Sequence, residues 1–143
     1  MIIRLVSEDD LPTCGKIYAE AFAAAPYYGE WTAESASEML SGLLERDPLH
    51  CWILEKDGTV VGFAFCTTFG KFRGTIQEFA VAPNFQKHGY GSKLMEHILA
   101  QFKNEGIQNA DLIANLDANA YRFYEKYGFR RPSRYTVMAR PLL

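Results

Sequence analysis

The chain has 143 residues, a length typical of a single domain of about 100–150 residues. Its hydrophobic share of 48% and charged share of 22% are those of a folded globular protein, which excludes a disordered chain. The formal net charge is −2, so the chain lacks the basic footprint of proteins that bind nucleic acid or anionic membranes. We therefore expect neither of these partners.

The N-terminal sequence and the cysteines favour a cytoplasmic location. The first ten residues, MIIRLVSEDD, do not resemble a secretory signal, and no run of about 18 apolar residues could span a bilayer. Cys14, Cys51 and Cys66 are odd in number and form no CxxC pair, which predicts buried free thiols. The histidines are too scattered for a metal site, and His97 is expected at the surface.

The first half of the chain predicts a strand, two helices and a hairpin. A strand over Ile2–Val6 precedes a helix, at whose start Ser7 and Asp10 have the spacing of a capping box. Thr32 is placed to cap a second helix. The Asp-Gly pair at residues 57–58 lies between two apolar runs, Cys51–Glu55 and Val60–Thr67, which is a strong hairpin signal.

The second half continues with alternating strands and helices. Apolar residues at helical spacing predict a helix over Gly89–Asn104, and Gly106 follows it in the left-handed role. The remaining expected elements are strands over Thr75–Val81, Asp111–Asn115 and Tyr135–Ala139 and a helix capped by Asp117 that runs to Tyr127. This order indicates one α+β domain over residues 1–143, with a central, mostly antiparallel sheet and about four helices.

A glycine-containing loop is the first motif that carries chemistry. Residues 86–91, Gln-Lys-His-Gly-Tyr-Gly, connect the strand ending at Val81 to the following helix. The first N–H groups of a helix have no partner within it and favour an anion, and glycine lets a ligand approach the backbone. Lys87 and His88 add positive charge, so a diphosphate fits such a loop. Alternatively, the two glycines serve only packing at a strand–turn–helix connection.

A second motif follows about thirty residues later. In the segment 117–129, DANAYRFYEKYGF, the residues Ala120, Phe123 and Tyr127 share one helical face beside Tyr124, and Gly128 ends the helix. An amphipathic helix with core aromatics would have the same pattern. Taken together and in this order, however, the two motifs resemble the GCN5-related N-acetyltransferase (GNAT) superfamily. Gln86, Gly89 and Gly91 match its Q/R-x-x-G-x-G/A loop, and the later segment matches N-x-x-A-x-x-(F/L)-Y-x-x-x-G-F from its alanine onward.

The resemblance implies a GNAT-type fold with a mixed sheet of about six to seven strands and helices on both of its faces. It also implies acetyl-CoA as cofactor, held beside a strand that often carries a bulge. The residues expected to bind it are Phe79, Ala80, Val81, Gln86, Lys87, His88, Gly89, Tyr90, Gly91, Ser92, Asn115, Asn119 and Tyr124. The sequence has Asp117 where the family most often has Asn. Which of Asn115, Asp117 and Asn119 contacts the pantetheine arm therefore stays open, and Asp117 could equally be only a helix cap.

Two residues are the catalytic candidates. An alkyl ammonium has a pKa near 10.4, so its amine needs a base at neutral pH. Glu78 lies on the strand expected beside the cofactor and is the candidate base, directly or through a water, although a lone Glu on a strand often only faces solvent. The resemblance implies that Tyr124 donates a proton to the departing thiolate; the alternative is a tyrosine of the core.

The acceptor is expected at the segment between the first two helices. Tyr27, Tyr28, Glu30 and Trp31 combine rings and a carboxylate, which could hold a cation, or the loop could fold onto its own hydrophobic cluster. We predict an acetyl-CoA-dependent N-acetyltransferase acting on a primary amine of a small molecule. The alternatives are a protein or peptide N-acetyltransferase and a non-catalytic acyl-CoA-binding module. The resemblance further suggests a homodimer.

Overall fold

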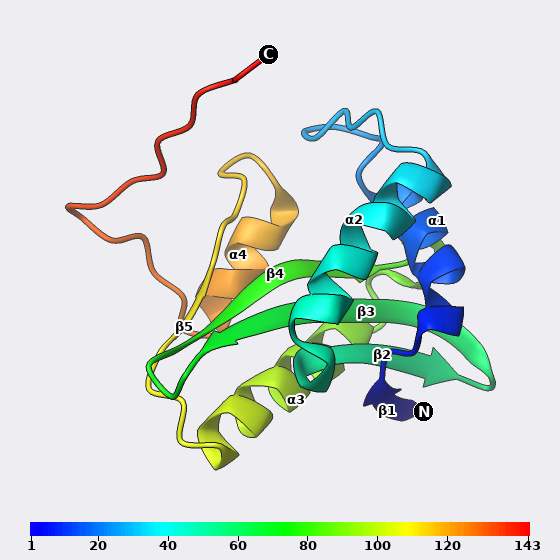
Figure 1. Cartoon of the computed structure of the whole chain (residues 1–143), viewed down its shortest axis with the longest axis horizontal. Coiled ribbons are helices and arrows are strands. Elements are labelled where there is room, and N and C mark those ends of the chain that lie inside the picture. Colours follow the sequence, from blue (N-terminus) through cyan, green and yellow to red (C-terminus); the bar gives the residue numbers. More distant parts are fainter. The chain divides into compact units, whose positions relative to one another are not determined.

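A five-stranded mixed sheet is the centre of Met1–Ile113, the first of two units into which the computed structural model divides the chain. The structure describes all 143 residues, and the second unit is Ala114–Leu143. The strands lie in chain order and are β1 (Ile2–Leu5), β2 (Cys51–Lys56), β3 (Thr59–Phe69), β4 (Arg73–Val81) and β5 (Ala110–Leu112). The pairs from β1 to β4 are antiparallel, and only β5 runs parallel to its neighbour β4 (Figure 1). The mostly antiparallel sheet is thereby confirmed, with fewer strands than the six to seven expected.

The missing strand is the one predicted over Tyr135–Ala139. This segment has no regular secondary structure, and Tyr135, Val137 and Met138 are exposed. Strand propensity measures how well a side chain packs on a pleated surface, and it does not by itself supply a hydrogen-bonding partner. The predicted strand at Asp111–Asn115 is also displaced, because β5 ends at Leu112.

Helices cover both faces of this sheet (Figure 1). On one face α1 (Leu11–Ala21) and α2 (Ala33–Arg46) pack against each other and onto the sheet. On the other face lies α3 (Tyr90–Asn104), which contacts β3 and β4. Three short 3-10 turns precede α1, β2 and α3, at Glu8–Asp10, Pro48–His50 and Pro83–Phe85. Helices on both faces thus agree with the expectation.

The core follows the alternation of side chains along the central strands. Phe63 and Phe65 of β3 point to the same side and pack with Leu40 of α2 and Cys14 of α1. Val61 of β3 is the extra residue where the register between β2 and β3 shifts, and it packs on the other side with Leu54 of β2 and Tyr90 of α3. Because the sheet is covered on both sides, its central strands are apolar on both faces. The three cysteines are buried and free, as predicted.

Local sequence signals account for most element ends. The backbone N–H of Ser35 donates to Thr32 Oγ1, and the Thr32 N–H donates to Ser35 Oγ, both at 3.0 Å. Asp57 and Gly58 both have positive φ, 51° and 78°, as a two-residue hairpin turn requires. Gly106 has a φ of 75° directly after the end of α3.

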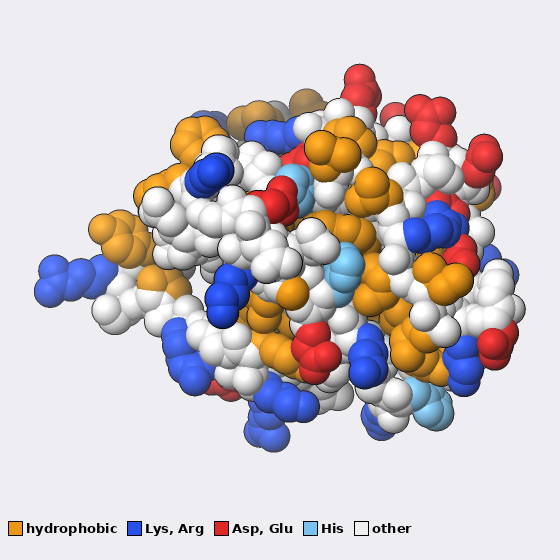
Figure 2. All heavy atoms as spheres, turned by 90° about the horizontal axis from the view of Figure 1, so that it is seen from below, with side chains coloured by type: hydrophobic (Ala, Val, Ile, Leu, Met, Phe, Trp, Pro, Cys, Tyr) orange, Lys and Arg blue, Asp and Glu red, His pale blue; other side chains and the backbone are white.

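The surface of the molecule is chemically mixed. Acidic, basic and hydrophobic side chains all occur on the face drawn in Figure 2. None of the helices combines the length and hydropathy needed to cross a lipid bilayer.

The prediction that His97 lies at the surface is wrong. Its ring packs edge-on against Trp52 with centroids 5.2 Å apart, and partial burial lowers its pKa.

The second unit contains α4 (Asn119–Lys126). Gly128, with a φ of 92°, follows the end of this helix as predicted. The cap predicted at Asp117 is wrong, because the N-cap residue is Ala118 and no side chain caps the helix. Instead, Asn115 Oδ1 accepts a hydrogen bond of 2.8 Å from the backbone N–H of Asp117, which closes a turn before the helix.

Candidate functional site

A β-bulge interrupts β4 at the centre of the first unit. Phe65 of β3 pairs with Glu78, but the next residue, Cys66, pairs with Ile76, so that Gln77 is an extra residue on β4. The ladder between β4 and β5 ends at the pair Ile76–Leu112, whereas β4 continues along β3 to Val81. A bulge re-aims side chains and ends regular pairing, and bulges are common beside active sites. The bulge expected in this strand is confirmed.

Beyond the bulge, the residues of β4 face the two sides of the sheet alternately. Ala80 packs in the cluster formed by α1 and α2, and Val81 packs against the cluster of Tyr90 on α3. Glu78 lies two residues before Ala80 and points to the same side of the sheet, toward the cluster that contains Tyr18 of α1. The Glu78 side chain is therefore partly buried on the side of the sheet that α1 covers.

Burial changes the acidity of this carboxyl group. Loss of hydration raises the pKa of Glu78 from 4.5 to about 7, and the hydrogen bond from Tyr18 acts in the opposite direction. Burial and the nearby Glu78 likewise raise the pKa of Tyr18, so this phenol stays a proton donor. A group whose pKa is close to neutral can both accept and release a proton at physiological pH. Among the predicted site residues, Glu78 has the environment of a general base.

The predicted anion-binding loop opens directly onto the N-terminus of α3. The first hydrogen bond of that helix joins the Lys93 N–H to the Gly89 carbonyl at 3.2 Å, so the N–H groups of residues 90–92 lie ahead of it. Gly89 has a φ of 83°, and a Cβ placed there would meet no atom within 4 Å. The glycine is thus required by the backbone conformation and leaves open space in front of the helix end. These features fit the diphosphate of coenzyme A.

Other residues of the loop have visible structural roles. The side-chain amide of Gln86 donates to the Val81 carbonyl at 3.0 Å, which ties the loop to the end of β4. Lys87 has a positive φ of 65° and is exposed, as is His88. The Tyr90 ring is buried against β2 and β3, and Lys56 Nζ lies 5.6 Å from its centroid. Tyr90 can therefore offer a ligand its backbone N–H rather than its side chain.

The loop between α1 and α2, residues 22–32, is where the acceptor is predicted to bind and is called the acceptor loop below; it combines both structures considered for it. Tyr27 packs edge-on against Phe22 with centroids 4.7 Å apart, so part of the loop does fold onto its own aromatic cluster. Tyr28, Glu30 and Trp31 remain exposed. The backbone N–H of Gly29 donates to the Phe22 carbonyl at 2.8 Å, which fixes the loop to the end of α1.

Tyr18 connects this loop to Glu78. Its ring lies edge-on to Trp31 at 5.2 Å and tilted against Phe22 at 4.5 Å, while its hydroxyl reaches Glu78. The sequence places Tyr18 only on the buried face of α1. Its hydroxyl was the only signal in the sequence, because a buried tyrosine usually needs a polar partner. The helical pattern does not show which residue, sixty positions away, lies near that hydroxyl.

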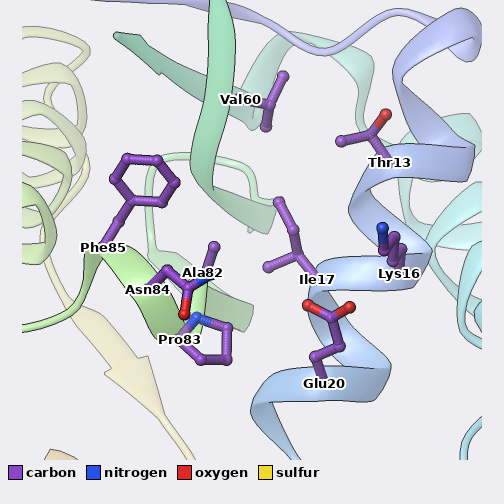
Figure 3. Close-up of a pocket in the computed structure, with 9 residues that line it drawn as sticks. All are labelled: Thr13, Lys16, Ile17, Glu20, Val60, Ala82, Pro83, Asn84 and Phe85. Carbon is purple, nitrogen blue, oxygen red and sulfur yellow. The ribbon is translucent and has the colours of Figure 1, made fainter.

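A cavity of about 230 Å³ lies between α1 and the segment leading into the glycine-containing loop (Figure 3). Ile17 of α1 lies opposite Ala82 and Phe85, and Glu20 and Lys16 add charges on the α1 side. The remaining lining residues are Thr13, Val60, Pro83 and Asn84. The cavity ends one residue before Gln86 and does not include Glu78.

The predicted site residues Asn115, Asn119 and Tyr124 belong to the second unit. Tyr124 lies on α4, and its ring contacts Phe123 and Phe129 with centroids 5.6 Å and 6.2 Å apart. Asn119 is the first residue of the helix, and Asn115 belongs to the turn before it. The structure thus brings Glu78, Tyr18 and the acceptor loop together in the first unit and arranges Asn115, Asn119 and Tyr124 along one segment of the second.

Comparisons with known proteins bear on this arrangement. The family model described as the acetyltransferase (GNAT) family matches residues 16–129. The chain is 32% identical over 139 residues to an uncharacterized N-acetyltransferase of Archaeoglobus fulgidus, an alignment that covers 92% of this chain and 95% of the relative.

A second relative carries a more specific name. The chain is 34% identical over 77 residues to the [ribosomal protein bS18]-alanine N-acetyltransferase of Haemophilus influenzae, covering 53% of this chain and 51% of that protein. Among solved structures, the PaiA N-acetyltransferase of Thermoplasma acidophilum in complex with coenzyme A superposes with a TM-score of 0.75. That alignment has 20% sequence identity and covers 90% of this chain and 89% of the other, so it shows a shared fold.

Proposed function

Since the chain belongs to the acetyltransferase (GNAT) family and is an N-acetyltransferase, we propose that it moves the acetyl group of acetyl-CoA to a primary amine of a small molecule. The observation that carries this proposal is the enclosed Glu78 carboxyl group, whose pKa near 7 suits a base at neutral pH. The neighbouring acceptor loop presents Tyr28, Glu30 and Trp31 at the surface, where rings and a carboxylate can attract an ammonium group.

In the proposed reaction, Glu78 accepts the proton that the amine loses, directly or through a water, as the new C–N bond forms and the C–S bond breaks. The N–H groups of Tyr90, Gly91 and Ser92, with the charge of Lys87, hold the diphosphate at the end of α3. The backbone of Phe79, Ala80 and Val81 on β4 runs on past the end of β5 and offers hydrogen-bonding groups along the pantetheine arm. Acetyl-CoA supplies the activated acetyl group as a thioester.

Tyr124 is proposed as the acid that donates a proton to the departing sulfur. We expect Tyr124→Phe to lower turnover by about ten- to a thousandfold while the affinity for acetyl-CoA hardly changes, because the ring stays and only the proton donor is lost. Turnover and acetyl-CoA binding, measured on the same preparation, check this. Unchanged turnover would remove Tyr124 from the mechanism.

A protein N-terminus is the second candidate acceptor. It is favoured by the similarity to an enzyme named for acetylating an alanine of a ribosomal protein, an alignment that covers half of each chain. An N-terminal α-amine has a pKa of about 7.7–8.0 and needs less help from a base than an alkyl amine does. The two candidates therefore differ in how strongly they depend on Glu78.

The decisive experiment is a thiol-release assay with acetyl-CoA against a panel of amines. The panel contains polyamines, aminoglycosides, other small primary amines and short peptides with free N-termini, and acetyl-CoA binding is measured by calorimetry in the same preparation. Release with a small amine supports the proposal, and release with peptides alone would replace it by the second candidate. Absence of acetyl-CoA binding would overturn the assignment of the glycine-containing loop.

A further inference from the structure

The cavity of Figure 3 has a mainly apolar lining and lies outside the proposed catalytic site. Ile17 of α1 lies across it from three partly buried residues, Val60, Ala82 and Phe85. Its volume of about 230 Å³ is smaller than the roughly 300–1,000 Å³ of pockets that hold drug-sized ligands. The space therefore fits a small metabolite.

Backbone hydrogen bonds hold the wall opposite α1 in place. The N–H of Ala82 donates to the Val61 carbonyl at 2.8 Å, and the N–H of Phe85 donates to the Ala82 carbonyl, also at 2.8 Å. The Phe85 ring further contacts the ring of the buried Tyr90, with centroids 6.2 Å apart. The wall is thus preformed, as in most small-molecule sites.

Two opposite charges lie on the α1 side of the cavity. Lys16 and Glu20 are about one helical turn apart, and both line the cavity. Both are exposed, and neither forms an ion pair with another side chain. Lysine before glutamate is the less favourable order for a pair at this helical spacing, which gives the two little reason to join each other. An ammonium group and a carboxylate are therefore both available beside an apolar space.

This combination fits one class of small molecule. The ammonium and carboxylate groups of a free α-amino acid leave the same carbon, and its side chain extends away from both. Lys16 can donate to the carboxylate and Glu20 can accept from the ammonium group, while an apolar side chain fills the space between Ile17 and Phe85. An alkyl amine or an alkyl carboxylate would leave one of the two charges without a partner.

We propose that this cavity binds a free α-amino acid with an apolar side chain, at a site separate from Glu78 and from the diphosphate. The side chain of Gln86, the residue after the cavity wall, donates to the Val81 carbonyl at 3.0 Å, so a bound amino acid packs against the segment that leads into the glycine-containing loop. The inference concerns binding alone and does not rest on the proposed acetyl transfer.

The first test measures the binding of L-leucine and L-phenylalanine to the full chain by calorimetry, with and without acetyl-CoA. We expect at least one of them to bind, and to bind also when acetyl-CoA is present in excess. Binding of neither would overturn the proposal. Displacement of the amino acid by acetyl-CoA would overturn it as well, because the cavity would then be part of the cofactor site.

The same experiment with leucine lacking one charged group tests the role of the two charges. The probes are 3-methylbutylamine, which lacks the carboxylate, and 4-methylpentanoate, which lacks the ammonium group. Each should bind at least about fivefold more weakly than L-leucine, since each loses a charged hydrogen bond at an exposed position. An analogue that binds as tightly as L-leucine would contradict the proposed recognition.

Three variants locate the bound amino acid. Lys16→Gln and Glu20→Gln each remove one charge and should weaken binding at least about fivefold. Thr13→Trp keeps both charges but adds a large ring to the lining, and it should weaken binding at least about tenfold. Unchanged affinity in all three variants would place the amino acid elsewhere and overturn the proposal.

The matched controls are Lys103→Gln and Glu45→Gln. Both residues are exposed and lie outside the cavity, so these variants change the net charge in the same way and should bind the amino acid as the unchanged protein does. Equal weakening in the controls would show an effect of net charge alone and would contradict the site. Thermal unfolding of each variant verifies that it is folded.

Discussion

Two carboxyl groups of the first unit, Asp10 and Glu78, have opposite acidities. Asp10, before α1, has a pKa lowered to about 2, whereas the pKa of Glu78 on β4 is raised to about 7. Both groups are partly withdrawn from solvent, so burial raises the pKa in each case. The difference comes from their partners: Asp10 receives two hydrogen bonds of 2.8 Å from the Arg4 guanidinium, whereas at Glu78 only the neutral Tyr18 hydroxyl acts against the effect of burial on the pKa.

This comparison separates a structural carboxylate from one suited to catalysis. The Asp10 carboxylate also accepts a hydrogen bond of 2.8 Å from the backbone N–H of Ser7, and Arg4 contacts Glu55 as well, so that two carboxylates share one guanidinium. Glu78 lacks a cationic partner and stays close to its titration point at neutral pH. Strongly perturbed and uncompensated groups of this kind are concentrated in functional sites.

The largest expected effect concerns the activity of Glu78→Gln. Glutamine keeps the size of the side chain but cannot accept the proton of the amine, so we expect kcat/KM to fall about 10²- to 10⁴-fold. The affinity for acetyl-CoA should hardly change, because the diphosphate loop is untouched. Steady-state kinetics together with calorimetric binding measures both quantities.

The control for this prediction is Glu96→Gln, because Glu96 is an exposed residue of α3. It removes the same charge from the protein outside the site and should leave the rate unchanged. Near-normal activity of Glu78→Gln would show that Glu78 is not the base, and the contrast with Asp10 would then concern acidity alone.

What sequence reasoning could predict depends on the range of the interactions involved. The turn at Asp57-Gly58 and the end of α3 at Gly106 were predictable, because each is set by the conformation of neighbouring residues. The cap at Asp117 and the strand at Tyr135–Ala139 were not, since both needed partners that local patterns do not specify.

The same distinction between local and long-range interactions applies to the candidate site. The glycine-containing loop could be recognised because its function lies in consecutive backbone N–H groups. Glu78 could be named as a candidate from its position, but its acidity follows from burial between β4 and α1 and from Tyr18, sixty residues earlier. Partial burial of the acceptor loop likewise required the ring contacts of Tyr27 and Trp31 with α1 and the residue that follows it.

The second-largest expected effect concerns the stability of Glu78→Gln. The pKa of Glu78 is about 7 in the folded protein and 4.5 in the unfolded chain. Between these values the folded state binds more protons, so the free energy of unfolding falls as pH rises through this window. Glu78→Gln removes that dependence and should be more stable than the unchanged protein above pH 7, by up to about 3 kcal/mol. Denaturant unfolding of both proteins at pH 4.5 and pH 8 measures this, and a difference independent of pH would contradict it.

The third expected effect concerns His50, whose ring lies between two carboxylates. His50 Nδ1 lies 2.7 Å from Asp47 Oδ1, and Nε2 lies 2.9 Å from Glu105 Oε1. Burial lowers the pKa of His50, but the hydrogen bonds to Asp47 and Glu105 outweigh it and raise the pKa above 6.5. We expect His50→Gln to lower the free energy of unfolding by about 2 kcal/mol at pH 6, since charged hydrogen bonds are lost.

The pH dependence of this loss has a definite sign. Because the folded state holds the imidazole proton more tightly, the stabilisation is complete below pH 6.5 and is lost as pH rises through the raised pKa of His50. The difference in unfolding free energy between the two proteins should therefore narrow on the alkaline side. A gap that widens with pH would show that the imidazole is neutral in its contact with the two carboxylates.

The smallest effect is expected for Asp10→Asn, and its pH dependence is opposite to that of Glu78→Gln. The pKa of Asp10 is about 2 in the folded protein and 3.8 in the unfolded chain, so its stabilisation is present above pH 3.8 and is lost as pH falls towards 2. We expect a loss of about 1 kcal/mol at pH 7, because solvent at the half-exposed Arg4 screens the pair.

Unfolding of Asp10→Asn and the unchanged protein, measured from pH 7 down to pH 2.5, checks this expectation. The two curves should approach each other below pH 3.8, because there the unfolded chain takes up a proton at Asp10 before the folded protein does. Acetyl transfer should be nearly normal in Asp10→Asn, because the carboxylate that it removes neutralises Arg4 and does not contact Glu78. A severe loss of turnover with normal folding would mean that a carboxylate paired with a guanidinium also serves catalysis, so that pairing with a cation would not distinguish Asp10 from Glu78.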